Sequence, residues 1–296
     1  MKGIILAGGN GTRLAPLTNV ISKQLLPVYD KPMICYPLAT LLNIGIKEIL
    51  IISTPNDTPH IEKFLGDGSN YGIKLSYKVQ DKASGIAEAF LIGEDFINND
   101  NVCLILGDNI FHGNEIRQEN LKDKIEKIEN GEIGGLVFSY NVSDPERYGV
   151  VEYDEEKDLA ISIEEKPKNP KSNLAVTGLY IYDKNVVEIT KKLKPSDRGE
   201  LEITDVNNAY LKNGKLSVVK LRRGFAWLDA GTPDSLLDSS NFIQTIEKRQ
   251  GLKIACLEEL ALMRKFITKD EFIEASKKYK KGSDYRNYLD LVLKIN

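Results

Sequence analysis

The stretch at residues 2–28 limits the fold and the chemistry of this chain more than any other. A short apolar run at residues 4–7 leads into a glycine-rich turn that reads GGNGTR. The run is too short for a helix and is typical of a buried parallel strand. Because glycine has no Cβ, Gly8, Gly9 and Gly11 allow positive φ values and a close approach of the backbone to a ligand. A turn of this kind after a strand directs successive N–H groups at one point and favours phosphate.

Two cations follow the turn and indicate that the ligand is a polyphosphate. Arg13 presents a fixed fork of donors, and Lys23 presents a mobile point charge. The turn differs from a dinucleotide fingerprint, because Leu14 stands where that fingerprint has its third glycine, and it lacks the Gly-Lys-Ser/Thr of a Walker A loop. A tight turn without a ligand is the structural alternative. The density of glycines, cations and prolines in one segment favours the binding site.

The composition excludes several classes of protein. Hydrophobic residues make up 42% and charged residues 28% of the 296 residues, as in an ordinary soluble globular protein. A net charge of −3 argues against a nucleic-acid partner. No apolar stretch approaches the roughly 20 residues that span a bilayer, so no membrane partner is expected. The three cysteines have no metal-type spacing and are odd in number, which favours reduced thiols in the cytoplasm.

Short apolar runs alternate with helical stretches, and this pattern predicts an α/β fold with a Rossmann-like, mostly parallel (mixed) sheet flanked by helices. In the first half we expect strands at residues 4–7, 48–53, 73–79, 102–106 and 135–140, and helices at residues 32–43, 57–65 and 121–129. Beyond residue 145, short β-rich pieces at 148–153, 159–163 and 176–182 predict an inserted region that closes over an acceptor site. Two helices and two strands follow before residue 233.

From residue 233 onward the pattern is mostly helical, with expected helices at 235–248, 257–266, 269–279 and 285–293. We expect one main α/β domain at residues 1–232, with a nucleotide-binding half at about 1–140 and a sugar-phosphate half at about 141–232, followed by a helical C-terminal region at 233–296.

Two aspartates stand at the ends of predicted strands. Asp108 follows an apolar run in LILGDN, and Asp229 precedes a glycine and a helix in WLDAGTP. Either could instead serve as a turn residue or a helix N-cap. Ligands of open α/β sheets lie beyond the carboxyl ends of the strands, where both carboxylates would face the glycine-rich turn. One or two carboxylates with phosphate oxygens are the usual ligands of Mg²⁺, so the pair predicts a Mg²⁺ site.

Several motifs resemble those of the sugar nucleotidyltransferases and, within that family, of the glucose-1-phosphate thymidylyltransferases. They are GGxGTRLxPxT from residue 8, SKQLLPV from residue 22, LGDN from residue 106 and WLDxGT from residue 227. The resemblance covers the chain to about residue 265. It implies Mg²⁺-dependent transfer of the dTMP group from dTTP to α-D-glucose 1-phosphate, with dTDP-glucose and pyrophosphate as products. It also implies that Asp108 and Asp229 are the metal ligands.

The resemblance also implies how the nucleotide is bound. Gly8, Gly9, Gly11, Thr12 and Arg13 would contact the phosphates together with Asp108. In the segment QDKASGIAEA from residue 80, Gln80 and Gly85 correspond to residues that contact the base in similar enzymes. A glutamine can pair with the imide edge of thymine or uracil, although a solvated loop residue is the alternative. The segment differs from the family pattern at Asp81, usually proline, and at Glu88, usually glutamine.

The acceptor side is implied by four further segments. They contribute Tyr148, Gly149, Glu165, Lys166, Thr177, Tyr180 and Arg198. Cations suit the phosphate of a sugar 1-phosphate, and a carboxylate or backbone group suits sugar hydroxyls. Judged without the resemblance, these charges would more often be solvated surface.

The implied mechanism needs no general base, because a sugar phosphate is already an anion at neutral pH. Catalysis then depends on positioning and charge neutralisation. Arg13 and Lys23 would stabilise the pyrophosphate and the charge on the α-phosphorus, and Lys166 would hold the incoming phosphate in line. His60 and His112 have no catalytic partner nearby in the sequence, and a surface position is expected for His112.

Three alternatives remain at this point. The nearest is the same chemistry with UTP, in a sugar-1-phosphate uridylyltransferase. A second is a non-catalytic protein of the same fold that binds nucleotide sugars and regulates another process, and a third is a dinucleotide-dependent oxidoreductase. The C-terminal stretch after residue 231 also resembles the thymidylyltransferases, which implies a homotetramer and a regulatory nucleotide site.

Overall fold

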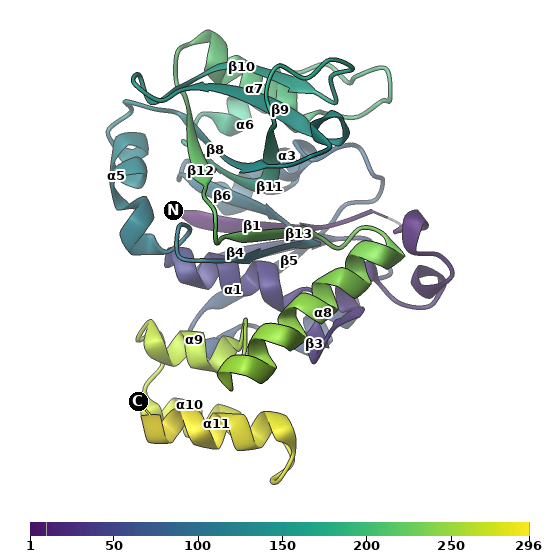
Figure 1. Cartoon of the computed structure of the whole chain (residues 1–296), viewed down its shortest axis with the longest axis vertical. Helices are drawn as coiled ribbons and strands as arrows, with labels where there is room; N and C mark the ends of the chain where they lie inside the picture. Colours follow the sequence, from purple (N-terminus) through teal and green to yellow (C-terminus); the bar gives the residue numbers. More distant parts are fainter. Residues whose placement is uncertain (10, 296) are drawn as a thin grey trace.

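The computed structural model describes residues 1–9 and 11–295, and its centre is a sheet of nine strands (Figure 1). Four parallel strands in the order β6-β1-β4-β5 form its first half: β1 (Lys2–Ala7), β4 (Glu48–Ser53), β5 (Lys74–Val79) and β6 (Val102–Leu106). Of these, β1, β4 and β6 are almost wholly buried, as expected for parallel strands covered on both faces. Because all four run in one direction, their carboxyl ends lie at one edge of the sheet.

The second half of the sheet is mixed. β11 (Leu174–Tyr182) runs antiparallel to β6 and joins the two halves. It pairs with β8 (Gly135–Asn141), which pairs in parallel with β12 (Leu216–Leu221). It also pairs with β9 (Gly149–Asp154), which forms an antiparallel ladder with β10 (Leu159–Glu165). The β-rich pieces expected beyond residue 145 are confirmed as strands of this sheet.

Helices cover both faces of the sheet, and alternate residues of β1 belong to different faces. Ile5 and Ala7 pack into one hydrophobic cluster, and Ile4 and Leu6 pack into the other. The first cluster includes residues of α1 (Cys35–Ile44), α2 (Thr58–Leu65) and α5 (Gln118–Glu129), and the second includes residues of α3 (Glu88–Ile92), α4 (Glu94–Ile97), α6 (Val186–Lys191) and α7 (Ile203–Lys212). Within the described part of the chain, no helix is both long enough and apolar enough to span a membrane.

Some local features differ from the sequence prediction. The helix expected at residues 32–43 begins only at Cys35, because β3 (Lys31–Pro32) pairs with β2 (Pro27–Val28) in a short hairpin. Pro37 lies in the first turn of α1, where its missing N–H has no helical partner to lose. The short helices α3 and α4 are not predicted from the sequence, since four or five residues carry too little periodicity.

A two-stranded ribbon outside the main sheet was also not predicted as such. β7 (Asn109–His112) follows β6 and pairs with β13 (Ala226–Asp229), which sets Asn109 opposite Asp229. The N–H of Ala230 donates to the carbonyl of Asp108 at 3.2 Å. The ribbon therefore brings two distant parts of the sequence together at the edge where the parallel strands end.

The ribbon leads directly into α8 (Pro233–Gln250), which begins with a capping box. Thr232 accepts from the backbone of Ser235, and the Ser235 hydroxyl accepts from the N–H of Thr232 at 2.9 Å. Pro233 occupies the first turn, which suits its fixed φ. The predicted domain boundary after residue 232 coincides with this helix start.

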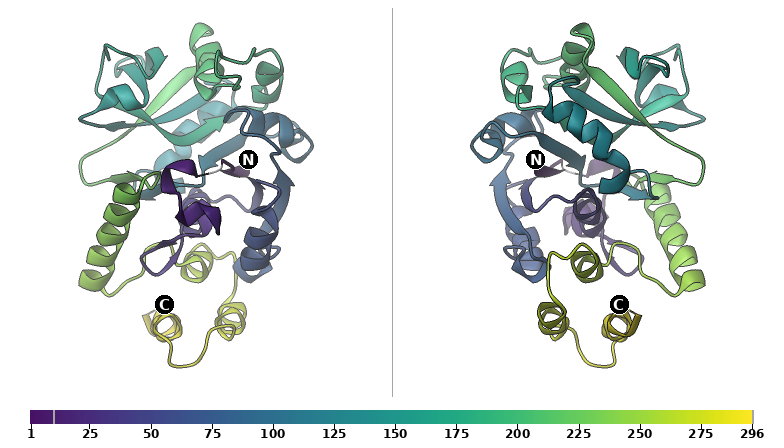
Figure 2. Two further views of the ribbon diagram at one scale, coloured as in Figure 1. Left: turned by 90° about the vertical axis from the view of Figure 1, so that its right-hand side faces the viewer. Right: turned by 90° about the vertical axis from the view of Figure 1, so that its left-hand side faces the viewer.

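The helical C-terminal region is confirmed. After α8 the chain forms α9 (Leu257–Met263), α10 (Lys269–Ser276) and α11 (Asp284–Ile295), which lie below α1 at the end of the molecule opposite β9 and β10 (Figures 1 and 2). A buried carboxylate joins these helices. Glu258 is 1% exposed and accepts from the hydroxyls of Tyr279 at 2.8 Å and Tyr285 at 2.9 Å, with Lys278 Nζ 3.4 Å away.

We predict that Glu258→Ala destabilises the protein by about 3 kcal/mol, because it leaves the half-buried hydroxyls of Tyr279 and Tyr285 without their acceptor. Urea denaturation of the full chain measures this change. Glu274→Ala on the exposed face of α10 is the control, and it should change the free energy of unfolding by less than about 0.5 kcal/mol. Equal effects of the two substitutions would contradict a structural role for Glu258.

Candidate active site

The carboxyl edge of the parallel strands brings together the residues singled out in the sequence. Gly8 follows β1, Gln80 follows β5, and Asp108 lies two residues after β6. β1 and β6 are apolar runs that end at a glycine, whereas β5 carries polar residues and ends just before Gln80. The site predicted from separate motifs is therefore assembled by the register of one sheet.

Asp108 is held by two neighbours. Lys23 Nζ donates to Asp108 Oδ2, and the side-chain amide of Asn109 donates to Asp108 Oδ1 at 2.9 Å. Burial raises the pKa of this carboxyl, but the charge and hydrogen bonds of Lys23 and the bond from Asn109 outweigh burial, so its pKa lies below the usual value. Asp108 is therefore ionised at neutral pH.

Asp229 lies in the ribbon, and its pKa is raised, in contrast to that of Asp108. Burial raises the pKa of its carboxyl, and the negative charge of Asp108 raises it further. The cations Lys23, Arg13 and Arg147 oppose this rise without cancelling it. A Cβ built on Gly231 would lie 2.9 Å from the Arg13 guanidinium and 3.0 Å from Asp229 Oδ1, so Arg13 and Asp229 share one small space.

The two aspartates fit a divalent cation in their number and their electrostatics. Mg²⁺ usually takes one or two protein carboxylates and completes its shell with phosphate oxygens and waters. Two partly buried carboxylates that repel each other would both be relieved by a shared cation. Within residues 1–9 and 11–295 no group of three or more His, Cys, Asp or Glu side chains has metal-site geometry, so phosphate oxygens would have to supply further ligands.

The glycine-rich turn is shaped by close contacts. A Cβ on Gly8 would lie 2.5 Å from Gln80 Oε1, so any other residue there would force the Gln80 side chain to move. Gly11 has φ +57°, and its carbonyl accepts from the hydroxyl of Thr18 at 2.8 Å. Thr12 and Arg13 follow in a short 3₁₀ turn with exposed side chains. The turn thus keeps its backbone near Gln80 and its polar side chains outward.

The acceptor segments meet on the other side of Asp108. Gly149 faces Glu165 across β9 and β10, and Glu165 Oε2 accepts from the hydroxyl of Thr204 at 2.7 Å. Lys166 has φ +42°, and its Nζ lies 3.7 Å from Glu165 Oε1 with half of the side chain exposed. Tyr148 packs edge-on against Trp227, with 5.2 Å between ring centroids. One carboxylate oxygen of Glu165 therefore binds the Thr204 hydroxyl, and the other lies beside the Lys166 ammonium.

β11 contributes a bulge to this side of the site. The pairing of β11 with β8 shifts register between Val176 and Tyr180. Inside the bulge, the N–H of Gly178 donates to Asn109 Oδ1 at 3.1 Å, and the buried hydroxyl of Thr177 has no hydrogen-bond partner in the described residues. Bulges next to sites redirect side chains, and this one leaves the fully buried Thr177 hydroxyl without a partner among the described residues.

Two of the predicted acceptor residues, Tyr180 and Arg198, are held by other side chains of the protein. Tyr180 is 4% exposed and stacks on Tyr182, so its ring belongs to the core. The guanidinium of Arg198 is bound by both carboxylate oxygens of Glu202, each at 2.9 Å, although half of its side chain is exposed. A phosphate at Arg198 would compete with Glu202 for these donors.

Sequence reasoning missed Asn109 and Trp227 as parts of the site. Asn109 Oδ1 accepts from the indole N–H of Trp227 at 2.7 Å and from the N–H of Gly178, while its amide donates to Asp108. Asn109 therefore ties β7, β11 and β13 to one carboxylate. Its place in LGDN was the available signal, but the three partners come from distant parts of the sequence.

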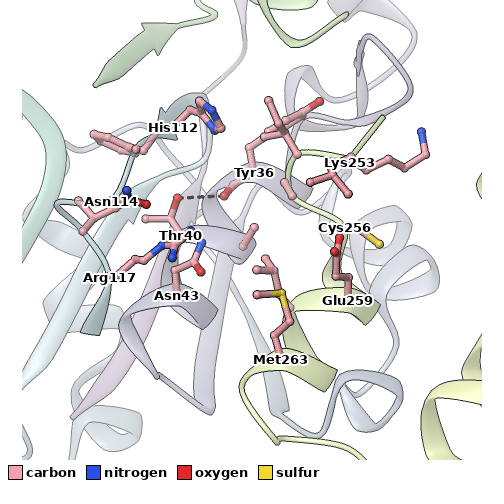
Figure 3. Close-up of a pocket in the computed structure, with 18 of the residues that line it drawn as sticks. Tyr36, Thr40, Asn43, His112, Asn114, Arg117, Lys253, Cys256, Glu259 and Met263 are labelled. Atoms are coloured by element: carbon pink, nitrogen blue, oxygen red, sulfur yellow. Dashed lines mark hydrogen bonds between the residues drawn. The ribbon is translucent and has the colours of Figure 1, made fainter. Parts of the chain in front are cut away.

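A cavity of about 550 Å³ lies away from these residues, between α1, the end of β7 and α9 (Figure 3). Its polar wall includes His112, Asn114 and Arg117 opposite Glu259 and Cys256. The structure places the half-buried ring of His112 in the lining of this cavity, with 5.9 Å between its centroid and that of the Phe242 ring. Burial, and then the charge of Arg117, lowers the pKa of His112.

Comparison with known proteins identifies the family. Residues 2–246 match the family described as Nucleotidyl transferase. The chain is 55% identical over 289 residues to the glucose-1-phosphate thymidylyltransferase of Neisseria gonorrhoeae, covering 98% of each chain. It is 51% identical over 296 residues to the glucose-1-phosphate thymidylyltransferase of Mycobacterium tuberculosis, covering all of each chain.

Solved structures agree with this result. A Bacillus anthracis protein described as a glucose-1-phosphate thymidylyltransferase, in complex with sucrose, superposes with a TM-score of 0.73 at 46% identity over 82% of this chain and 94% of that one. A UDP-glucose pyrophosphorylase with bound UDP-glucose superposes with a TM-score of 0.71 at 26% identity over 83% and 98%. The chain therefore belongs to the nucleotidyl transferase family and, within it, to the glucose-1-phosphate thymidylyltransferases.

Proposed function

We propose that this enzyme transfers the dTMP group of dTTP to α-D-glucose 1-phosphate and releases pyrophosphate. The observation that carries the proposal is the convergence of Lys23, Asp108, Asp229 and Arg13 at the strand edge beside the glycine-rich turn. The identity to enzymes named for this reaction supports it over most of the chain. The oxygen of the sugar phosphate attacks the α-phosphorus, and the bond to the pyrophosphate breaks.

Mg²⁺ is the proposed cofactor, with Asp108 and Asp229 as its protein ligands. When bound, it neutralises phosphate charge and orients the phosphate oxygens. Lys23 pairs with Asp108 and lies next to the same carboxylate edge, where it would meet the α-phosphate. Arg13, beside Asp229, would stabilise the charge that develops on the departing pyrophosphate.

The remaining predicted residues divide between the two substrates. Gly8, Gly9, Gly11 and Thr12 would bind the triphosphate through backbone and hydroxyl donors, and Gln80 and Gly85 would contact the base. Lys166 and Arg198 would bind the sugar phosphate, and Tyr148, Gly149, Glu165 and Thr177 would form the sugar pocket. The sequence predicts Tyr180 in this pocket as well, but its ring is buried in the core and would not contact the sugar. Support comes from the short contacts among Gly149, Glu165 and Thr204, and from the unpaired hydroxyl of Thr177.

The choice of base is tested by measuring pyrophosphate release with α-D-glucose 1-phosphate as the acceptor. The purified protein is mixed with Mg²⁺, α-D-glucose 1-phosphate and each nucleoside triphosphate in turn. We expect fast release with dTTP and slower release with UTP, and no release without Mg²⁺. Release with UTP alone would keep the mechanism but overturn the assignment of the base. The absence of release from a folded sample would favour another acceptor sugar, or a binding protein without catalysis.

Asp229→Asn separates catalysis from folding. We expect turnover with Mg²⁺ to fall on the order of a hundredfold to a thousandfold, because a charged ligand is lost where phosphate charge develops. The pKa of Asp229 is raised in the folded state, so its ionisation costs stability; this cost builds up as the pH rises from the unfolded-state pKa through the folded-state pKa and is constant above it. The melting temperature of Asp229→Asn should therefore be unchanged or higher.

The control is Asp238→Asn, which removes a carboxylate from the exposed side of α8. Turnover and melting temperature should both stay close to those of the unaltered enzyme. If Asp229→Asn kept full Mg²⁺-dependent turnover, Asp229 would not be a metal ligand.

The cavity in Figure 3 supports feedback inhibition as a second function. Its volume suits a nucleotide-sized ligand, and Arg117, Lys253 and Arg264 give it three cations. Lys253 and Arg264 already pair with Asp30 and Glu119, whereas no ion pair to Arg117 occurs in the described residues. An anionic product such as a dTDP-deoxysugar fits this charge, with Arg117 as its phosphate partner.

We predict that dTDP-rhamnose lowers the rate of the unaltered enzyme and that Arg117→Gln weakens this inhibition about tenfold, through loss of one charged contact. Rates without dTDP-rhamnose should not change. Lys122→Gln, which removes an exposed cation from α5, is the matched control and should leave inhibition intact. No effect of dTDP-rhamnose on the unaltered enzyme would rule out this ligand at the cavity.

We propose a cytoplasmic homotetramer as the assembled form. Large apolar side chains are exposed on the N-terminal segment and α8, including Val20 at 91% and Leu237 at 60%. The burial of such residues favours association. Light scattering should give a molar mass near four times that of one chain, and a monomeric mass would contradict the proposal.

A further inference from the structure

A carboxylate beside the nucleotide side of the site has no role in the mechanism above. Glu88, the first residue of α3, lies next to the carboxamide of Gln80. Gln80 Nε2 donates to Glu88 Oε2 at 2.7 Å and to the carbonyl of Gly85 at 3.3 Å. An ionised carboxylate and a backbone carbonyl can only accept hydrogen bonds, so both contacts require the amide nitrogen. The orientation of the Gln80 amide is therefore fixed by its partners.

The amide oxygen points the other way, toward the glycine-rich turn. The position of a Cβ on Gly8 would lie 2.5 Å from Gln80 Oε1 and 3.7 Å from Cδ, so the oxygen is the atom nearest this turn. Within residues 1–9 and 11–295, no group donates a hydrogen bond to Oε1. Gln80 is 6% exposed, so the side chain has little freedom to turn. The side of Gln80 that faces the glycine-rich turn therefore presents an acceptor to which no side chain or backbone group of the described residues donates.

We propose that Glu88 is a specificity-determining positioning residue, which holds Gln80 so that only its carbonyl oxygen faces the nucleobase. This inference rests on the proposed function. Thymine and uracil carry an N–H at N3, which can donate to Gln80 Oε1. Cytosine has an acceptor at N3, and two facing acceptors leave both unpaired. A buried site built for one hydrogen-bond pattern rejects the base that cannot complete it.

A reversed amide would not rescue cytosine. If Gln80 turned by half a rotation, its oxygen would face the Glu88 carboxylate and the carbonyl of Gly85, and both contacts would become repulsive. A glutamine at position 88 would remove this restriction, because its own amide can turn to offer either a donor or an acceptor. Because its carboxylate can only accept hydrogen bonds, Glu88 permits a single orientation of the Gln80 amide.

The test compares dTTP and CTP in the full-length protein. Pyrophosphate release with Mg²⁺ and α-D-glucose 1-phosphate gives kcat/KM for each nucleotide, and a melting curve monitors folding. We expect Glu88→Gln to raise the CTP-to-dTTP ratio of kcat/KM about tenfold, the effect of one misplaced hydrogen bond. Its melting temperature should stay unchanged. Glu62→Gln on the exposed side of α2 is the control and should leave the ratio unchanged.

Glu88→Ala is the second variant, because it removes the acceptor without supplying an amide, and it should raise the same ratio. An unchanged ratio in both folded variants would overturn the proposal. If the unaltered protein turns over no triphosphate, the proposed function fails. Calorimetry then measures the affinities for dTTP and CTP in the unaltered protein and in both variants. A CTP-to-dTTP affinity ratio that rises in the variants supports the role of Glu88, and an unchanged affinity ratio overturns it.

Discussion

The close approach of two carboxylates, Asp108 and Asp229, is the constraint on which the rest of the site depends. Each is partly buried, and the charge of Asp108 raises the pKa of Asp229. Lys23 compensates Asp108 directly, while Arg13 only reduces the effect on Asp229. A buried like-charge pair costs stability unless cations surround it. The surrounding fold supplies those cations and still leaves the pKa of Asp229 raised, which favours the Mg²⁺ site proposed above.

Asn109 makes this arrangement rigid. A carboxylate at the end of a strand could adopt several rotamers, but the Asn109 amide fixes Asp108 while its oxygen binds the β11 bulge and the indole of Trp227. One side chain thereby links Asp108 to the β11 bulge and to β13 of the ribbon. A fixed distance would matter for the proposed mechanism, which depends on holding two anions in line rather than on proton transfer.

Much of the fold and part of the site could be predicted from the sequence, and the reasons are local. Apolar runs ending in glycine or aspartate identify β1 and β6, and parallel strands place Gly8 and Asp108 at one edge. The partners of Asn109 and the contact between Gln80 and Glu88 could not be predicted, because they depend on side chains brought together only by tertiary packing. The same holds for the cavity at His112, which needs α1 and α9 to be placed.

β7 connects the candidate active site at Asp108 with the cavity at His112. It begins directly after Asp108 and ends at His112, and its ladder with β13 pairs His112 with Ala226 and Asn109 with Asp229. A ligand that moved His112 would therefore act on the same ribbon that positions Asp229. Coupling of this kind is reciprocal in binding free energy. An inhibitor that weakens nucleotide binding through the ribbon should itself bind less tightly when the nucleotide is present.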